Sequence, residues 1–124
     1  MHAMGHELSS LYDMTHGVTL ALITPAYLEY SLEKAPEYTW LFANFARNVF
    51  GVTEENDEVA AKKGIEKVKE FTLTIKIPQN LKEADVEEDK LEYLAEKATE
   101  FSNIGPMCRI EKEEALEIYR RAYK

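Results

Sequence analysis

The sequence predicts an all-α fold, in which residues 1–124 form a single helical domain of about six or seven helices. Apolar residues recur at three- and four-residue spacing along nearly the whole chain, which is the period of a helix with one buried face. Prolines and glycines interrupt this pattern where helices are expected to begin and end. Only residues 72–77, Thr-Leu-Thr-Ile-Lys-Ile, alternate as a short strand would. The local geometry of that segment therefore stays open.

The first two helices are expected to be separated by a short turn. The first covers residues 3–13, and the second runs over about residues 16–34. Thr15 precedes the second helix and is a suitable N-cap, because its hydroxyl can accept a hydrogen bond from a free backbone N–H. Pro25 lies inside the second helix, where it removes one backbone donor and predicts a kink.

A third and a fourth helix follow, each with a recognisable start. Pro36 is placed to begin the third and Gly51 to end it. Trp40 and the phenylalanines near it are expected in the core, because large aromatic side chains dominate protein interiors. Thr53 or Asn56 then caps a fourth helix. Its expected inner face consists of Ala61, Ile65, Val68 and Phe71.

The last two helices complete the predicted domain. Asp85 and Glu88 have the spacing of a capping box, which predicts the start of a fifth helix. Its expected buried residues are Leu91, Leu94, Ala95, Ala98 and Phe101. A sixth helix is expected over about residues 111–123, with Leu116 and Tyr119 facing the core.

Composition excludes several classes of function. A net charge of −8 argues against binding to nucleic acid or to an anionic membrane surface. The longest apolar run, Val18 to Ile23, is too short to span a bilayer, and we find no signal peptide. The single Cys108 cannot form an internal disulfide, which fits the reducing cytoplasm. A small residue in a loop is a better interpretation of Cys108 than a nucleophile.

All three histidines of the chain lie within its first sixteen residues. On a helix, His2 and His6 at i, i+4 share one face, and a turn could bring His16 back toward them. Imidazole is the commonest metal-ligating side chain, so the cluster predicts a site for a divalent metal. Spacing alone favours His2 and His6 as the ligand pair. Glu7 and Asp13 are acidic neighbours that could orient an imidazole. An exposed helix position explains Glu7 somewhat better, and a helix end explains Asp13 equally well.

The same stretch resembles a known signature. The residues that carry the resemblance are His2-x3-His6-Glu-Leu-x3-Tyr12-Asp13-x-Thr15-His16-Gly17, then Leu20-Ala21-x2-Thr24-Pro25-x3-Glu29-Tyr30, Asn48-Val49-Phe50-Gly51, Ile77-Pro78-x2-Leu81 and Leu116-Glu117-Ile118-Tyr119. In this order they resemble the C-terminal helical domain of iron-containing alcohol dehydrogenases, nearest to the butanol dehydrogenase branch. The histidine signature is specific, and the later segments support it together.

The resemblance implies a role for each histidine. His2 and His16 match the family's two metal ligands from this domain, and His6 matches a catalytic residue beside the metal, near nicotinamide and substrate. The metal implied is Fe(II), or another divalent ion such as Zn(II). An Asp and a His from an upstream domain would complete the site. That N-terminal domain also carries the Gly-rich loop for NAD(H) or NADP(H), whereas this chain has only five isolated glycines.

The family therefore implies an enzyme that interconverts primary alcohols such as butanol and their aldehydes. There, the metal acts as a Lewis acid on the alcohol oxygen while hydride moves to the nicotinamide. The chain alone is expected to be inactive, and to associate as a homo-oligomer through apolar residues around its first two helices. The alternatives are a stand-alone helical module that binds a transition metal, and an interaction module with a vestigial site.

Overall fold

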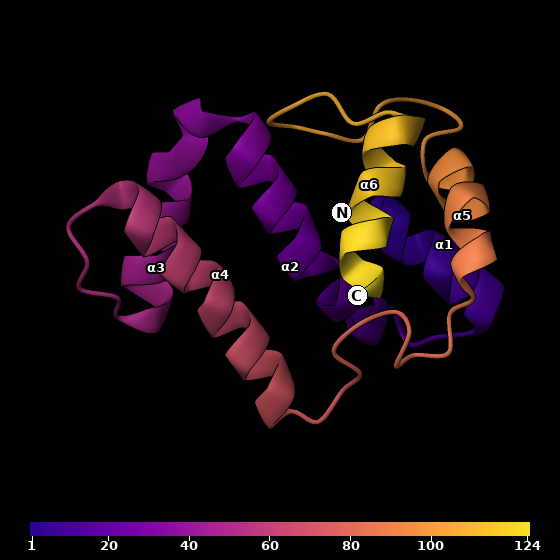
Figure 1. Ribbon diagram of the computed structural model, residues 1–124, viewed down its shortest axis with the longest axis horizontal. Coiled ribbons are helices and arrows are strands. Elements are labelled where there is room, and N and C mark those ends of the chain that lie inside the picture. The colour runs from indigo at the N-terminus through magenta and orange to yellow at the C-terminus, as the bar shows by residue number, and fades with distance from the viewer.

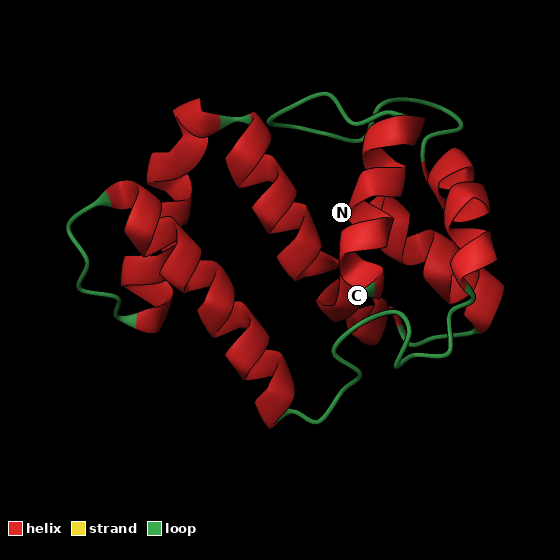
Figure 2. Ribbon diagram, in the orientation of Figure 1, coloured by secondary structure: helices red, strands yellow, loops and turns green.

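The computed structural model describes residues 1–124 and confirms the all-α prediction, with six α-helices and no strand (Figure 2). The α-helices are α1 (His2–Tyr12), α2 (His16–Lys34), α3 (Thr39–Phe50), α4 (Asp57–Thr74), α5 (Leu91–Ala98) and α6 (Lys112–Tyr123), joined by the 3-10 turns η1 (Pro36–Tyr38) and η2 (Glu88–Lys90). In Figure 1, α2 runs through the middle, with α3 and α4 on one side of it and α1, α5 and α6 on the other. None of these helices combines the length and the apolar character that crossing a membrane requires.

Most helix ends lie where local sequence signals placed them. Pro36 begins the 3-10 turn that leads into α3, and Gly51 ends α3 with a left-handed φ of 66°. Asn56 caps α4, since its side-chain oxygen accepts a hydrogen bond of 3.0 Å from the Val59 N–H. Thr15 occupies the N-cap position of α2, but its side chain makes no capping hydrogen bond. Thr15 thus marks the start of α2, but it lacks the capping hydrogen bond that the sequence predicted.

The structure settles the segment whose geometry the sequence left open, and it contradicts one local prediction. The strand-like residues 72–77 instead continue α4 as far as Thr74, and Lys76 with a φ of 56° then turns the chain. Alternation alone could not make a strand here, because a strand needs a neighbouring strand to satisfy its backbone groups. Asp85 does not cap α5. The capping box of this fold is formed by Glu111 and Glu114 at the start of α6.

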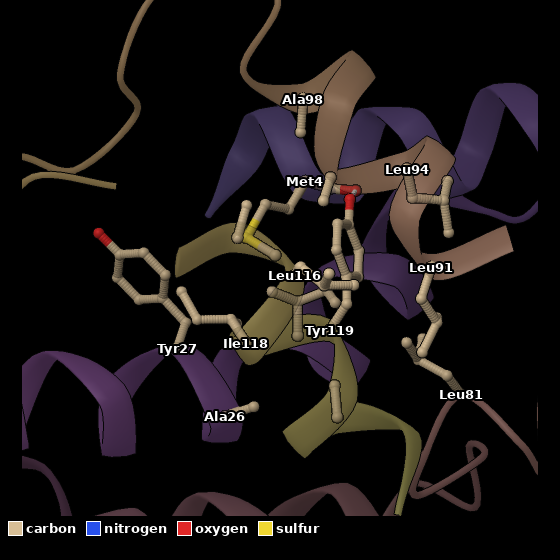
Figure 3. Close-up of a cluster of buried hydrophobic side chains, with 14 of the residues drawn as sticks. Met4, Ala26, Tyr27, Leu81, Leu91, Leu94, Ala98, Leu116, Ile118 and Tyr119 are labelled. Carbon is tan, nitrogen blue, oxygen red and sulfur yellow. Dashed lines mark hydrogen bonds between the residues drawn. The ribbon is translucent and has the colours of Figure 1, made fainter. Parts of the chain in front are cut away.

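The main core is a cluster of 19 buried residues from α1, α2, α5, α6 and the loops before α5 and α6. Figure 3 shows Tyr119 of α6 at its centre, reaching toward Met4 of α1. The Tyr119 side chain is fully buried, and its hydroxyl donates a hydrogen bond of 2.8 Å to the Met4 carbonyl oxygen. Burial raises the pKa of Tyr119 well above its usual range, so the phenol stays neutral and acts as a donor. The core thereby holds the helix that carries His2 and His6.

The helices α3 and α4 pack against each other outside that cluster. Small residues let the two helices approach closely, and Gly64 lies so near Ala46 that an added Cβ would stand 2.6 Å from the Ala46 Cβ. Phe42 and Ile65 are buried, but several other large apolar side chains of the two helices lie at the surface, with Trp40 52% exposed and Phe71 55% exposed.

Of the aromatics expected in the core near Trp40, Phe42 is buried as predicted, whereas the prediction was wrong for Trp40 and Phe45. Phe71 was likewise wrongly placed on the inner face of α4. Phe101 was wrongly placed in the core of α5, since it is 94% exposed in the loop after that helix.

Gly64→Ala is expected to destabilise the chain by about 1–3 kcal/mol, as overpacked cores do. Alanine favours helix by about 1 kcal/mol over glycine, but its methyl group would overlap Ala46 and force α3 and α4 apart. Urea denaturation followed by circular dichroism measures the change. Gly17→Ala is the matched control, because nothing lies within 4 Å of the added carbon there. A Gly64→Ala protein as stable as the control would contradict this packing.

Candidate metal centre

The three histidines converge where α1 and α2 meet. His2 and His6 lie one turn apart on α1, and His16 is the first residue of α2. Between the helices, Asp13 adopts a left-handed φ of 53° and turns the chain so that α2 packs against α1. The His16 ring lies 5.6 Å from the His2 ring and 4.7 Å from the His6 ring, measured between centroids. The sequence-based expectation that a turn returns His16 to the other two is met.

The end of α1 is held in place by the loop before η2. The Tyr12 hydroxyl donates a hydrogen bond of 2.5 Å to the Glu87 side chain and accepts one of 3.3 Å from the Glu87 N–H. Burial and the negative charge of the Glu87 carboxylate raise the pKa of Tyr12 to about 12, so the phenol remains a donor at neutral pH. This contact fixes the point at which the chain turns toward His16.

The donor atoms of the cluster suit a single metal ion. One imidazole nitrogen from each of His2, His6 and His16 lies within 4.8 Å of the other two. Two nitrogens at about 2.0–2.1 Å from a tetrahedral ion are roughly 3.4 Å apart, so small side-chain rotations would close the site. None of the three side chains is buried. The cluster therefore has room on its open side for further ligands, and no other part of residues 1–124 offers a comparable group.

Other candidate residues do not join the cluster. Neither Glu7 nor Asp13 hydrogen-bonds an imidazole, and Asp13 serves to end α1. Cys108 is half-buried, and burial raises the pKa of its thiol, with the nearby carboxylates Glu37 and Glu114 adding to the effect. A raised pKa keeps the thiol protonated and weakly nucleophilic. The interpretation of Cys108 as a small loop residue is consistent with this environment.

Two residues at the base of the cluster were not predicted from the sequence. Gly5 lies between His2 and His6 on α1 and is buried against α2. Thr19 is fully buried on α2, and its hydroxyl donates a hydrogen bond of 2.9 Å to the carbonyl oxygen of His16. The available signal was the glycine itself, because glycine inside a helix is unfavourable unless close packing requires it.

Comparison with known proteins identifies the family of this chain. The family model described as "Fe-containing alcohol dehydrogenase family, C-terminal" matches residues 1–123. The chain belongs to this family. The NADH-dependent butanol dehydrogenase A of Clostridium acetobutylicum is 37% identical over 98% of the chain, and the 1,3-propanediol dehydrogenase of Klebsiella pneumoniae is 34% identical over 99% of it.

A solved structure gives the same result for the fold. The crystal structure of NADH-dependent butanol dehydrogenase A from Thermotoga maritima superposes with a TM-score of 0.84 at 30% identity, over 99% of the chain. In each case the match covers 32% of the other protein. The chain therefore spans about a third of the length of these relatives and corresponds to the family's C-terminal, all-helical part.

Proposed function

We propose that the chain is the metal-binding part of an iron-type, nicotinamide-dependent alcohol dehydrogenase that interconverts small primary alcohols and aldehydes. The observation that carries the proposal is the convergence of three imidazoles from two helices, in a chain of this family. The donor set fits a divalent ion, since His2 and His16 offer two nitrogen ligands, His6 places a third imidazole beside them, and the cluster has an open side. Butanol and 1,3-propanediol, which give two relatives their names, define the substrate class.

Within the site, the three histidines take different roles. His2 and His16 hold the metal with one imidazole nitrogen each, and His6, edge-on to the His16 ring, faces the substrate. A divalent ion bound there supplies Lewis-acid polarisation of the alcohol oxygen. His6 orients the substrate and relays the hydroxyl proton toward solvent, a task suited to an imidazole because its ring can both accept and donate a proton. Both ligating imidazoles must be neutral, so the site loses metal in acid.

The rest of the enzyme lies, on this proposal, in an upstream domain that supplies the remaining ligands and binds the nucleotide. NAD(H) follows the names of the NADH-dependent relatives, and iron follows the family. NADP(H) and Zn(II) are the alternatives to be compared in the same assay. The single cysteine is in keeping with a cytoplasmic enzyme.

We expect the isolated chain to show no metal-dependent turnover of butanol or butyraldehyde with NAD(H) and Fe(II). The same chain, joined to the N-terminal two-thirds of the Clostridium acetobutylicum butanol dehydrogenase A, should reduce butyraldehyde. A His16→Ala variant of the joined protein is the inactive control. Robust turnover by the isolated chain would contradict the proposal. Tight metal binding without any activity of the joined protein would instead favour the stand-alone metal-binding module.

We also expect the isolated chain to associate with itself. Eleven large apolar side chains are more than a third exposed to solvent, and most belong to α3, α4 and the turn after α4. Only Leu11 comes from the first two helices, where the apolar surface was expected. Exposed apolar surface of this kind favours association. Light scattering should give a mass above 14.3 kDa that grows with concentration, and a monomer at high concentration would refute the expectation.

A further inference from the structure

We propose that Gly5 and Thr19 form a size-matched contact that sets the separation of α1 and α2 and thereby positions His16 against His2 and His6. The proposal rests on the metal-binding function proposed above and adds two positioning residues to it. Neither residue offers a ligand to the metal. Their effect is exerted through the distance between the two helices that carry the ligands.

The first observation is the closeness of the helices at Gly5. A Cβ placed on Gly5 would stand 3.1 Å from Thr19 Oγ1 and 3.1 Å from Leu20 Cδ2. Such distances are shorter than ordinary carbon contacts, which lie at about 3.5–4.0 Å. The same Cβ would lie 3.8 Å from Cε1 of the His16 ring, which is a normal contact. The absence of a side chain at position 5 therefore lets α1 approach α2 directly beneath the His16 imidazole.

The second observation is that the Thr19 side chain cannot easily move away from position 5. Its side chain is fully buried, its hydroxyl donates to the His16 carbonyl oxygen at 2.9 Å, and its Oγ1 lies 3.4 Å from Ser9 Oγ. Rotation away from position 5 would break the hydrogen bond to the His16 backbone. The Leu20 Cδ2 atom is the end of a flexible side chain and can move aside. A methyl group on Gly5 must therefore either displace Thr19 or separate the helices.

Separation of the helices would act directly on the cluster. His2 and His6 flank Gly5 on α1, whereas His16 begins α2, three residues before Thr19. The ligand nitrogens of His2 and His16 lie within 4.8 Å of each other and must come closer to share an ion. Because the side chains have only limited reach, movement of α1 away from α2 removes His16 from the shared site.

Four variants of the full chain test the contact: Gly5→Ala, Thr19→Ala, the double variant and Gly17→Ala. Co(II) is the probe, followed by titration and by its visible absorption, which reports the ligand geometry. Gly5→Ala should weaken Co(II) binding by about 10- to 100-fold, as loss of supporting contacts does at metal sites. Thr19→Ala makes room for the new methyl group, so the double variant should bind within about threefold of Thr19→Ala alone. Gly17→Ala, which adds its carbon in open space beside His16, should match the wild type.

A second readout keeps this test separate from the metal-binding proposal. Nuclear Overhauser contacts between the His6 and His16 rings in the metal-free chain should weaken in Gly5→Ala and return in the double variant. If the wild-type chain binds no Co(II) even when joined to the upstream part of butanol dehydrogenase A, the proposed function fails, and these contacts still decide the role of Gly5 and Thr19. Unchanged Co(II) affinity and ring contacts in Gly5→Ala, or a loss that Thr19→Ala does not relieve, would overturn the inference.

Discussion

His16→Ala is expected to abolish metal binding in the chain joined to the upstream part of butanol dehydrogenase A, and His2→Ala should do the same. Each substitution removes one of the two neutral imidazoles proposed as ligands, and a site left with fewer ligands does not retain its ion. His6→Ala should keep the metal and lose turnover by about 100-fold or more, as loss of a general acid or base does. Metal content by elemental analysis and the rate of butyraldehyde reduction separate these outcomes.

The opposite pattern would identify a different ligand pair. If His6→Ala empties the site while His16→Ala leaves it filled, the i, i+4 pair His2 and His6 holds the ion. Distances do not separate the two candidate pairs, because all three nitrogens lie within the same 4.8 Å. The variants are therefore needed to distinguish them. Circular dichroism of each variant is the control, since these side chains are not buried and their removal should leave the fold unchanged.

Tyr119→Ala is expected to destabilise the chain by about 3–5 kcal/mol, as the loss of a large buried aromatic side chain does. Tyr119 is fully buried between α1 and the rest of the core, and its hydroxyl bonds the Met4 carbonyl oxygen. Tyr119→Phe keeps the ring and loses one hydrogen bond, so about 1 kcal/mol is expected. Urea denaturation followed by circular dichroism measures both changes.

The control for Tyr119 is another tyrosine. Tyr93 on α5 is 49% exposed, and Tyr93→Ala should change the free energy of unfolding by no more than about 0.5 kcal/mol. Equal effects of Tyr119→Ala and Tyr93→Ala would contradict the assignment of Tyr119 to the centre of the core.

Helix positions could be predicted from the sequence because their signals are local. Pro36, Gly51 and Asn56 act on the backbone of their own helix ends, and the predicted second helix coincides with α2. Burial was harder to predict. Periodicity identifies an apolar face without showing which neighbour covers it, and α3 and α4 approach each other closely at the small residues Gly64 and Ala46. Large aromatics such as Trp40 therefore remain outside, where composition alone suggested a core.

The candidate site was predictable in part. The i, i+4 spacing put His2 and His6 on one face, but the return of His16 depends on the left-handed backbone of Asp13. A non-glycine residue in that conformation has only a weak sequence signal. The division into ligands and catalyst came from the family resemblance and stays a prediction. The contact of Gly5 with Thr19 joins residues on different helices, so only the packed structure revealed it.

The most direct test of the proposed metal centre is anomalous scattering from crystals of the chain grown with Fe(II) or Co(II). We expect one peak at the α1–α2 junction, about 2.0–2.2 Å from an imidazole nitrogen of His2 and of His16, with His6 facing the same ion. A peak coordinated by His2 and His6 with His16 turned away would contradict the ligand assignment. Ordered crystals that show metal only at other residues would contradict the metal centre itself.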